Sequence, residues 1–507
     1  VGEEARIDAI LATLTLEQKI AQMIQPEIRD VSVEDQRRYG FGSVLNGGGS
    51  FPGGDKHASP SDWLALADAF YDASLDRSQG SAGIPVIWGT DAVHGHNNVY
   101  GATLFPHNIG LGATHNPALA GRIAEATARE VRVTGQDWIF APTVAVAVDP
   151  RWGRTYESFS SQPDLVTSFV APVVEGLQSQ QTIATAKHFI GDGGTRGGED
   201  QGDTVLPLDE LMRIHGPGYE AAIEAGVLTI MASFSSWNGQ KVHGSRQLLT
   251  EVLKDDMGFD GIVVSDWNGI GQVRYCSNDD CAQAINAGID MVMVPVEWKA
   301  FMDTTLQQVR DGLIPQTRID DAVRRILRVK LRAGLLDDAR PPSARAADQP
   351  VGTLGAPAHR ALAADAVRQS LVLLKNNDQL LPLTPTADIL VAGSTADDIA
   401  RQSGGWTLSW QGTGNSQQDF PGATSIFQGL QQQVMSGGRV RLLPDGAYEE
   451  KPDVAVIVFG EEPYAEGIGD VAHLSHSARY PEDLALMRRL QENGVPVVGV
   501  FITGRPA

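Results

Sequence analysis

The sequence predicts an α/β protein in which a (β/α)8 barrel is followed by an α/β sandwich domain with a mostly parallel sheet. Up to about residue 335, short β-branched apolar runs alternate with helical stretches, and the runs end in polar or glycine residues. These two observations predict the barrel. The apolar runs of the last third are continuous, which indicates parallel strands that are buried on both faces.

Seven segments of the first region have the composition of barrel strands, and a barrel of this kind needs eight βα units. The predicted strands are 42–46, 85–90, 138–146, 183–188, 228–234, 261–265 and 290–294. Between them, 118–133 and 248–257 show helical spacing, and Asn116 with Pro117 is a good helix start. We expect such helices to form the outer ring of the barrel.

A linker is predicted between the two regions. Residues 336–356 combine charges, prolines and alanines, and we interpret them as an exposed linker between domains at 1–335 and 357–507. The second domain should begin with a helix at 359–369. Its predicted strands are 370–374, 389–393, 454–459 and 497–502. Because the chain stops at Ala507 directly after a strand, we expect further C-terminal sequence.

Composition excludes several classes of partner. The formal net charge of −22 repels polyanions, so we expect neither nucleic acid nor anionic membrane as a partner. No run approaches the roughly 18 consecutive apolar residues of a membrane helix, so we expect no membrane insertion. The beginning of the chain lacks a basic start and an apolar signal core. A removed signal peptide would leave the same beginning, and we expect a periplasmic or extracellular location.

The two cysteines, Cys276 and Cys281, lie five positions apart in a polar loop. A short disulfide and two free thiols are both compatible with this spacing. Four intervening residues match neither a zinc site nor a thioredoxin-type motif, and His94 and His96 have no third ligand at a suitable spacing. We therefore expect no metal site and no organic cofactor.

Polar residues follow several predicted strands, at the end where the catalytic groups of a (β/α)8 barrel lie. They are Asp91 with His94 and His96, Asp149 with Arg151 and Arg154, Lys187 with His188, and Asp266 with Trp267. The pair Asp266 and Trp267 is the most specific indication of function, because a carboxylate suits attack on a sugar ring and an indole supplies a flat apolar wall. An Asp that caps the next helix is the alternative interpretation.

With these motifs the chain resembles glycoside hydrolases of family 3, and most of all the plant and bacterial exo-β-glucan glucohydrolases. The resemblance covers nearly the whole chain. In the first domain it is carried by the segments 90–96 (TDAVHGH), 149–154 (DPRWGR), 187–189 (KHF) and 265–267 (SDW). In the second domain it is carried by Gly404, Gly405, Trp406 and Trp410, and by the loop 460–470.

The resemblance implies that Asp266 is the nucleophile. It also implies that four further side chains, Asp91, Arg154, Lys187 and His188, hold the hydroxyls of the terminal glucose. The residue types agree with this role, because sugar hydroxyls need both donors and acceptors, and charged groups make strong hydrogen bonds. For Lys187 and His188, an internal ion-pair network is the alternative interpretation.

The acid is expected in the second domain. Glu461, Glu462 and Glu466 lie within one loop, and only one of them can reach the leaving oxygen; Glu466 fits the family position. This role requires a raised pKa, which a partly closed cleft beside the charge of the nucleophile would supply. We further expect Trp267 and Trp410 to form the two walls of an aromatic clamp around the sugar on the leaving side.

Two positions depart from the family pattern. Phe234, a predicted substrate contact, stands where the plant enzymes carry Tyr, and Asn268 follows Trp267 where an acidic residue is common. These departures bear on fine tuning near the nucleophile and leave the reaction class unchanged.

The sequence therefore predicts a retaining, exo-acting β-glucosidase that cleaves β-glucosides and β-glucan oligosaccharides by double displacement. An N-acetylglucosaminidase or phosphorylase of the same family is one alternative, but it places a His acid in the loop after Lys187 and His188. Here that loop, 191–200, contains no His. A non-catalytic sugar-binding protein is the other alternative, and it would have no reason to keep two opposed carboxylates, Asp266 and Glu466.

Overall fold

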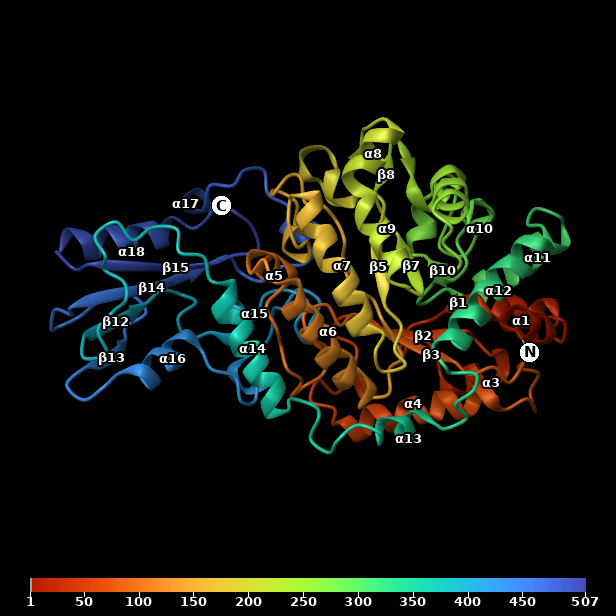
Figure 1. Cartoon of the computed structure of the whole chain (residues 1–507), viewed down its shortest axis with the longest axis horizontal. Coiled ribbons are helices and arrows are strands. Elements are labelled where there is room, and N and C mark those ends of the chain that lie inside the picture. The colour runs from red at the N-terminus through yellow and green to blue at the C-terminus, as the bar shows by residue number, and fades with distance from the viewer. Residues whose placement is uncertain (1) are drawn as a thin grey trace.

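The computed structural model describes residues 2–507 and shows two units side by side, a barrel and a smaller sandwich (Figure 1). Eight parallel strands form the barrel: β1 (Ile24–Gln25), β2 (Ser43–Asn46), β3 (Ile87–Thr90), β4 (Trp138–Ile139), β5 (Thr185–Phe189), β7 (Thr229–Ala232), β10 (Ile262–Val264) and β11 (Val292–Met293). Ladders join β11 to β1, and they form two three-stranded sheets with the orders β2-β3-β4 and β5-β7-β10. The single bridges Glu27–Leu45, Trp138–Ile183 and Val264–Met291 close the ring.

Most barrel strands are shorter than their apolar runs predict. The prediction of a strand over 138–146 is wrong beyond Ile139, because β4 has only two residues. Pro142 follows soon after and has no backbone N–H with which to continue a ladder. Strand β1 was not predicted, since its two residues include Gln25 and give no apolar run.

Helices surround the barrel as expected. They are α1 (Glu3–Leu11), α2 (Leu16–Gln22), α3 (Val33–Tyr39), α4 (Pro60–Leu75), α5 (Asn108–Ala113), α6 (Pro117–Arg132), α7 (Pro163–Leu177), α8 (Leu208–His215), α9 (Pro217–Glu224), a π-helix (Gln247–Asp256), α10 (Ala282–Ala287), α11 (Trp298–Arg310) and α12 (Gln316–Arg332). The Asn116 side chain caps α6 by accepting from the backbone N–H of Leu119. Within residues 2–507, no helix has the length and apolarity needed to cross a membrane.

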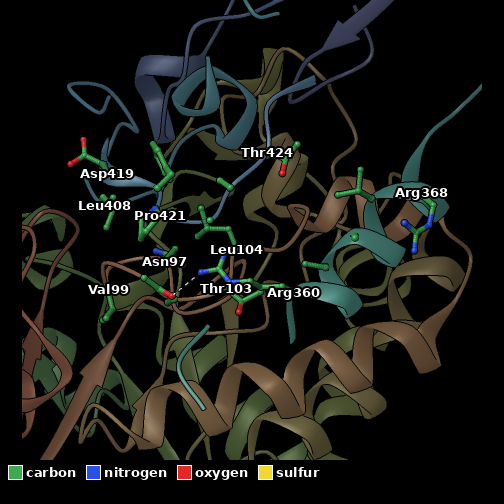
Figure 2. Close-up of a pocket in the computed structure, with 18 residues that line it drawn as sticks. Asn97, Val99, Thr103, Leu104, Arg360, Arg368, Leu408, Asp419, Pro421 and Thr424 are labelled. Atoms are coloured by element: carbon green, nitrogen blue, oxygen red, sulfur yellow. Dashed lines mark hydrogen bonds between the residues drawn. The ribbon is translucent and has the colours of Figure 1, made fainter. Parts of the chain in front are cut away.

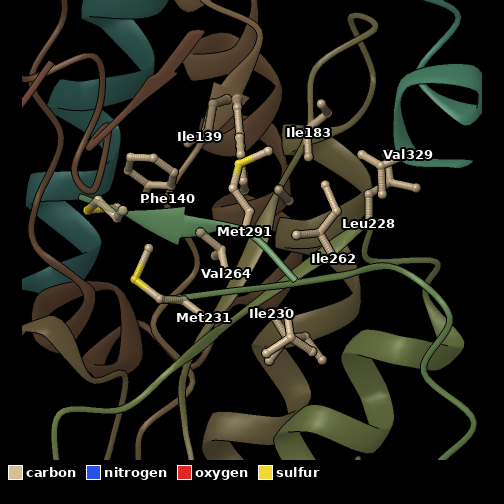
Figure 3. Close-up of a cluster of buried hydrophobic side chains, with 14 of the residues drawn as sticks. Ile139, Phe140, Ile183, Leu228, Ile230, Met231, Ile262, Val264, Met291 and Val329 are labelled. Carbon is tan, nitrogen blue, oxygen red and sulfur yellow. The ribbon is translucent and has the colours of Figure 1, made fainter. Parts of the chain in front are cut away.

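The barrel core is continuous from the strands to the helices. Figure 3 shows apolar side chains of the barrel strands, among them Ile139, Ile230 and Ile262, which belong to one buried cluster together with Val329 of α12. The interior also holds a polar layer, in which the Trp138 indole N–H donates to the hydroxyls of Thr185 and Thr229 at 2.8 and 3.0 Å. Both hydroxyls are thus satisfied although they are fully buried.

The second unit is a sandwich of three layers. Its parallel sheet has the order β13 (Arg439–Leu442), β12 (Asp388–Ala392), β14 (Val454–Gly460), β15 (Val497–Ile502). Alternate side chains of β12 and β14 face opposite layers. One set packs against α16 (Ile426–Gln433), and the other packs against α18 (Pro481–Glu492).

Apart from short 3-10 turns, the remaining elements are short or connect the two units. They are α13 (Pro342–Ala346), α14 (Pro357–Ser370), α15 (Ile399–Ser403), α17 (His476–Arg479), and a small sheet of β6 (Asp203–Thr204), β8 (Ser236–Trp237) and β9 (Gln240–Lys241). Helix α14 agrees with the helix predicted at 359–369. In the segment 336–356, interpreted as exposed, α13 instead packs on the barrel, and its buried Arg345 donates to Asp137 at 3.0 Å.

The predicted strand at 370–374 is wrong. Helix α14 continues to Ser370, and the next four residues belong to no ladder. Their side chains, from Leu371 to Leu374, are 62–86% exposed. An apolar run becomes a strand only where a neighbouring strand pairs with it, and within residues 2–507 no strand pairs with this segment.

Candidate active site

Every predicted catalytic or substrate-binding residue lines one cavity of about 570 Å³ at the mouth of the barrel. The cavity is lined by Arg29, Leu45, Gly47, Gly48, Asp91, Phe140, Arg154, Lys187, His188, Gln201, Met231, Phe234, Asp266, Trp267, Asn268, Gln272, Met293, Trp406, Trp410 and Glu466. Most of these residues end barrel strands or follow them. The last three come from the second unit, so the cavity lies between the two units.

Another cavity, of about 510 Å³, lies between the barrel loop 97–104, helix α14 and the loop 419–424 (Figure 2). None of the predicted site residues lines it. Its central Arg360 donates to the backbone carbonyls of Gly355 and Gly101, a bonding pattern that ties loops together.

Asp266 follows β10 and is buried. Its Oδ1 accepts the backbone N–H of Trp267 at 2.7 Å, and His188 Nε2 lies 3.6 Å from Oδ2. Oδ2 has no hydrogen-bond partner among the described residues. Burial raises the pKa of Asp266 to about 6, although Arg154 and Lys187 oppose the rise. At neutral pH this carboxyl is ionised, with one oxygen free to react.

Glu466 begins a 3-10 turn, Glu466–Gly469, in the loop after β14. Arg154 of the barrel donates from Nη1 to its Oε1 at 2.9 Å. Burial raises the pKa of Glu466 to about 8, and the charge of Asp266 adds to the rise while Arg154 opposes it. The two carboxyls of the cavity therefore differ at neutral pH, where Glu466 keeps its proton and Asp266 does not.

The other two glutamates of this loop have different surroundings. Both carboxyl oxygens of Glu461 are bonded, one to Thr503 at 2.6 Å and the other to Arg479 and Arg505 at 2.8 and 3.1 Å. Although burial acts to raise it, the pKa of Glu461 is lowered, mainly by Arg505. Glu462 is exposed and does not line the cavity.

A network of charged and polar groups covers the floor of the cavity. Lys187 Nζ lies 3.3 Å from Asp91 Oδ1, so both ends of this pair face the cavity. Asp192 accepts from His188 Nδ1 at 2.9 Å. Burial lowers the pKa of His188, which is therefore neutral at neutral pH, with its Nε2 directed toward Arg154 and Asp266. The network offers donors and acceptors at one place, as a sugar with several hydroxyls needs.

Aromatic side chains form the walls of the cavity. Phe234, Trp267 and Trp410 line it as predicted from sequence, and Trp410 is 40% exposed. Trp406 also lines it, and the indole N–H of Trp406 is buried without a partner among the described residues. In the sequence, Trp406 belongs to a family motif, but nothing there predicts that its side chain lines the cavity.

Sequence reasoning also missed Arg29, which follows the unpredicted strand β1. Reading the polar residues after every short segment, apolar or not, would have found it. No group of three or more His, Cys, Asp or Glu side chains within residues 2–507 is arranged to hold a metal ion.

Family models match both units. The model described as the glycosyl hydrolase family 3 N terminal domain matches residues 15–329, and the C-terminal domain model of the same family matches residues 371–507. The chain belongs to glycosyl hydrolase family 3. This confirms the resemblance that the motifs indicated, and with it the expected fold class.

The individual proteins and structures that this family 3 chain resembles are named as glycosidases, in agreement with the family assignment. A lysosomal beta glucosidase of Dictyostelium discoideum is 33% identical over 99% of this chain and 66% of its own length. A periplasmic beta-glucosidase of Salmonella typhimurium is 28% identical over 83% of this chain and 59% of its own. The crystal structure of an exo-1,3/1,4-beta-glucanase from a Pseudoalteromonas species is 53% identical with a TM-score of 0.96, and the match covers 99% of this chain and 64% of that one. The chain thus spans less than two thirds of the length of these relatives, between 59% and 66%.

Proposed function

We propose that this chain carries the catalytic machinery of a retaining, exo-acting β-glucosidase, which releases glucose from the non-reducing ends of β-1,3- and β-1,4-glucan oligosaccharides. The observation that carries the proposal is the pairing of two carboxyls in one cavity with pKa values of about 6 and about 8. A nucleophile must be ionised and an acid protonated at the same pH. The names of the relatives support the same substrate class.

In the proposed mechanism, Glu466 donates its proton to the glycosidic oxygen while Asp266 attacks the anomeric carbon. The bond to the leaving sugar breaks, and glucose is held as an ester of Asp266. Glu466, now ionised, then takes a proton from water, and the resulting hydroxide attacks the anomeric carbon. Glucose leaves, Asp266 is free again, and Glu466 has regained its proton.

The charged groups of the cavity floor are proposed to bind the terminal glucose. Asp91 accepts and Lys187 donates to neighbouring hydroxyls, and His188 and Arg154 bind next to the reacting carbon. The proposal is supported by their position, because all four line the same cavity as Asp266. Because these groups bond to one another and to the carboxylates without the sugar, the site is arranged before the substrate arrives.

Trp267, Trp410 and Phe234 are proposed to bind on and around the leaving side. Sugar rings present apolar C–H faces that stack on flat indoles, and stacking tolerates rotation of the ring. We therefore propose that Trp267 and Trp410 clamp the leaving sugar, and that the clamp accepts more than one β-linkage. Phe234 offers an apolar contact without the hydroxyl of a tyrosine.

The test is glucose release from laminari- and cello-oligosaccharides, with proton NMR of the first product. We expect β-glucose first, because a nucleophile and an acid at about 5 to 5.5 Å leave no room for a directly attacking water. α-Glucose as the first product would contradict retention. If no β-glucoside is cleaved but glucose still binds, the sugar-binding alternative is correct.

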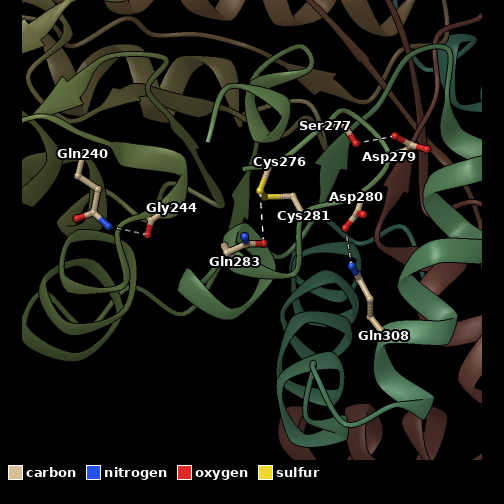
Figure 4. Close-up of a disulfide and its surroundings, with 9 residues drawn as sticks. All are labelled: Gln240, Gly244, Cys276, Ser277, Asp279, Asp280, Cys281, Gln283 and Gln308. Atoms are coloured by element: carbon tan, nitrogen blue, oxygen red, sulfur yellow. Dashed lines mark hydrogen bonds between the residues drawn. A yellow bond between two sulfur atoms is a disulfide. The ribbon is translucent and has the colours of Figure 1, made fainter. Parts of the chain in front are cut away.

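We also propose a periplasmic or extracellular location. Cys276 and Cys281 form a disulfide within their polar loop (Figure 4), and structural disulfides persist mainly in oxidising compartments. A relative named as periplasmic agrees with this. Fractionation of producing cells, with activity assayed in each fraction, tests the proposal; activity confined to the cytoplasm would contradict it.

A further inference from the structure

Three Arg or Lys side chains line the cavity, and two of them pair with carboxylates that line the cavity as well. Arg154 binds Glu157 and Glu466, and Lys187 lies beside Asp91. The third, Arg29, lies in the loop after β1, with 52% of its side chain exposed. This arginine has no role in the mechanism above.

The guanidinium of Arg29 is held in place on one side only, through its Nε–H group. Its Nε donates to the carboxylate of Glu27, which is fully buried. Glu27 is itself held by the Ser50 hydroxyl at 2.7 Å. Within the described chain, neither Nη1 nor Nη2 of Arg29 donates a hydrogen bond; only its backbone N–H and its Nε do so, both to Glu27. A guanidinium held in this way presents two parallel N–H donors in a fixed plane.

These donors, which make no hydrogen bond within residues 2–507, lie near the part of the cavity lined by the partly buried Trp267 and the exposed Trp410. A Cβ on Gly47 would be 3.0 Å from Trp267 Cζ3 and 3.8 Å from Arg29 Nη2. A Cβ on Gly48 would be 2.9 Å from the Trp410 Cα. A side chain at either glycine would therefore collide with one of the two tryptophans, and the guanidinium of Arg29 lies close to the same backbone segment.

We propose that Arg29 is a specificity-determining residue, which donates through Nη1 and Nη2 to two neighbouring hydroxyls of the sugar on the leaving side. The proposal rests on the proposed β-glucosidase function and extends it. Stacking on indoles selects a flat ring but does not distinguish a saccharide from an aryl group. Two coplanar donors do distinguish them, because an aryl leaving group has no pair of hydroxyls.

The experiment compares Arg29→Ala with the wild type on laminaribiose, cellobiose and 4-nitrophenyl β-glucoside. Loss of a charged hydrogen bond should raise the KM for both disaccharides by roughly tenfold, and by at least five times more than the KM for the aryl glucoside. The disaccharide kcat should change less than KM. Glu27→Gln keeps the size of the anchor but removes its charge, and it should raise the disaccharide KM in the same direction by a smaller factor.

Arg246→Ala is the matched control, because Arg246 is exposed, its ion pair is with Glu251, and neither residue lines the cavity. It should leave all three KM values unchanged. If Arg29→Ala proves unstable in thermal melting, Arg29→Gln keeps one amide donor and should give an intermediate KM for the disaccharides.

Equal changes of KM for the disaccharides and the aryl glucoside would overturn the proposal for Arg29 and leave the β-glucosidase function standing. No change for either disaccharide would overturn it as well. If the wild type cleaves none of the three substrates, the proposed function itself is wrong.

Discussion

In the barrel, Asp266 follows a strand that is fully buried between two other buried strands, whereas Glu466 lies in a loop beside a sheet whose edge strand β15 is half exposed. The proposed nucleophile is thus positioned by the unit that carries it. The proposed acid is positioned largely by the other unit. Arg154 binds its carboxyl, and Asp470 accepts the backbone N–H groups of Gly153 and Asp200 at 2.7 and 2.8 Å.

Close packing reinforces this arrangement. A Cβ on Gly153 would lie 2.0 Å from the carbonyl oxygen of Glu466, so only glycine lets the acid loop rest on the barrel here. The buried Arg505 of the second unit donates to the backbone carbonyls of Pro150 and Arg151 in the barrel. We infer that the position of Glu466, the proposed acid, is set by the contact between the units rather than by the sandwich alone.

The largest effect is expected for Asp266→Asn. The covalent step needs the carboxylate, so turnover should fall by several orders of magnitude while glucose binding and thermal melting stay near those of the wild type. Rates on an aryl glucoside and calorimetric binding of glucose measure this. Retention of more than about a tenth of the activity would show that another group is the nucleophile.

Glu466→Gln should lower the turnover of disaccharides less, by roughly a hundredfold to ten-thousandfold, because general acid catalysis contributes about that factor to the rate. The loss should shrink on aryl glucosides with acidic leaving groups, which need little protonation. Glu462→Gln is the control, since Glu462 is exposed outside the cavity and its change should be silent. A uniform loss on all leaving groups would argue against the role as acid.

The pH profile distinguishes the two carboxyls. Below about pH 6 Asp266 gains a proton and loses its nucleophilic charge, and above about pH 8 Glu466 loses the proton it must donate. We therefore expect kcat/KM to be greatest between these values and to fall about tenfold per pH unit outside them. In Glu466→Gln the alkaline decline should disappear while the acidic one remains; an unchanged alkaline limb would contradict the assignment.

Asp470→Ala tests whether the contact between the units positions the acid. Without the carboxylate that joins the acid loop to Gly153 and Asp200, we expect kcat to fall by roughly tenfold, since small displacements of catalytic groups are costly. The inhibition constant of glucose should change little, because the glucose-binding groups belong to the barrel. Asp470→Asn keeps an acceptor oxygen and should lose less. If kcat is unaffected, the loop is positioned by the sandwich itself.

The smallest effect is expected for Trp410→Ala, which removes an exposed wall from the second unit. KM for disaccharides should rise several-fold, and more than KM for aryl glucosides, because an aromatic leaving group depends less on two-sided stacking of a sugar. Trp267→Ala should act in the same direction. Equal losses on every substrate would contradict the clamp.

Prediction from sequence succeeded where a strong apolar run also finds its partners. The runs at 228–234 and 261–265 became neighbouring strands, and the polar residues after such runs meet in one cavity. Prediction failed where the pairing of a segment with a neighbouring strand, and not its composition, determines whether it becomes a strand. Leu371 to Leu374 are apolar but unpaired, and β1 is paired although its two residues carry no pattern.

The same distinction applies to the candidate site. Motifs identified Asp266 and Glu466, but not the free donors of Arg29, because these depend on a buried partner, Glu27, that bonds only one edge of the guanidinium. The unequal pKa values of the two carboxyls likewise arise from burial between two units, and no local sequence carries that information.

The pairing of β1 with β11 has a consequence for the order in which the protein is made. Ile24 lies opposite Val292, so the first strand stays without one of its two neighbours until most of the barrel has left the ribosome. Contacts of such long sequence separation form late and slowly. The loop that bears Arg29 directly follows this first strand. We therefore expect the part of the cavity rim around Arg29 to be the last part of the barrel to reach its folded position during synthesis.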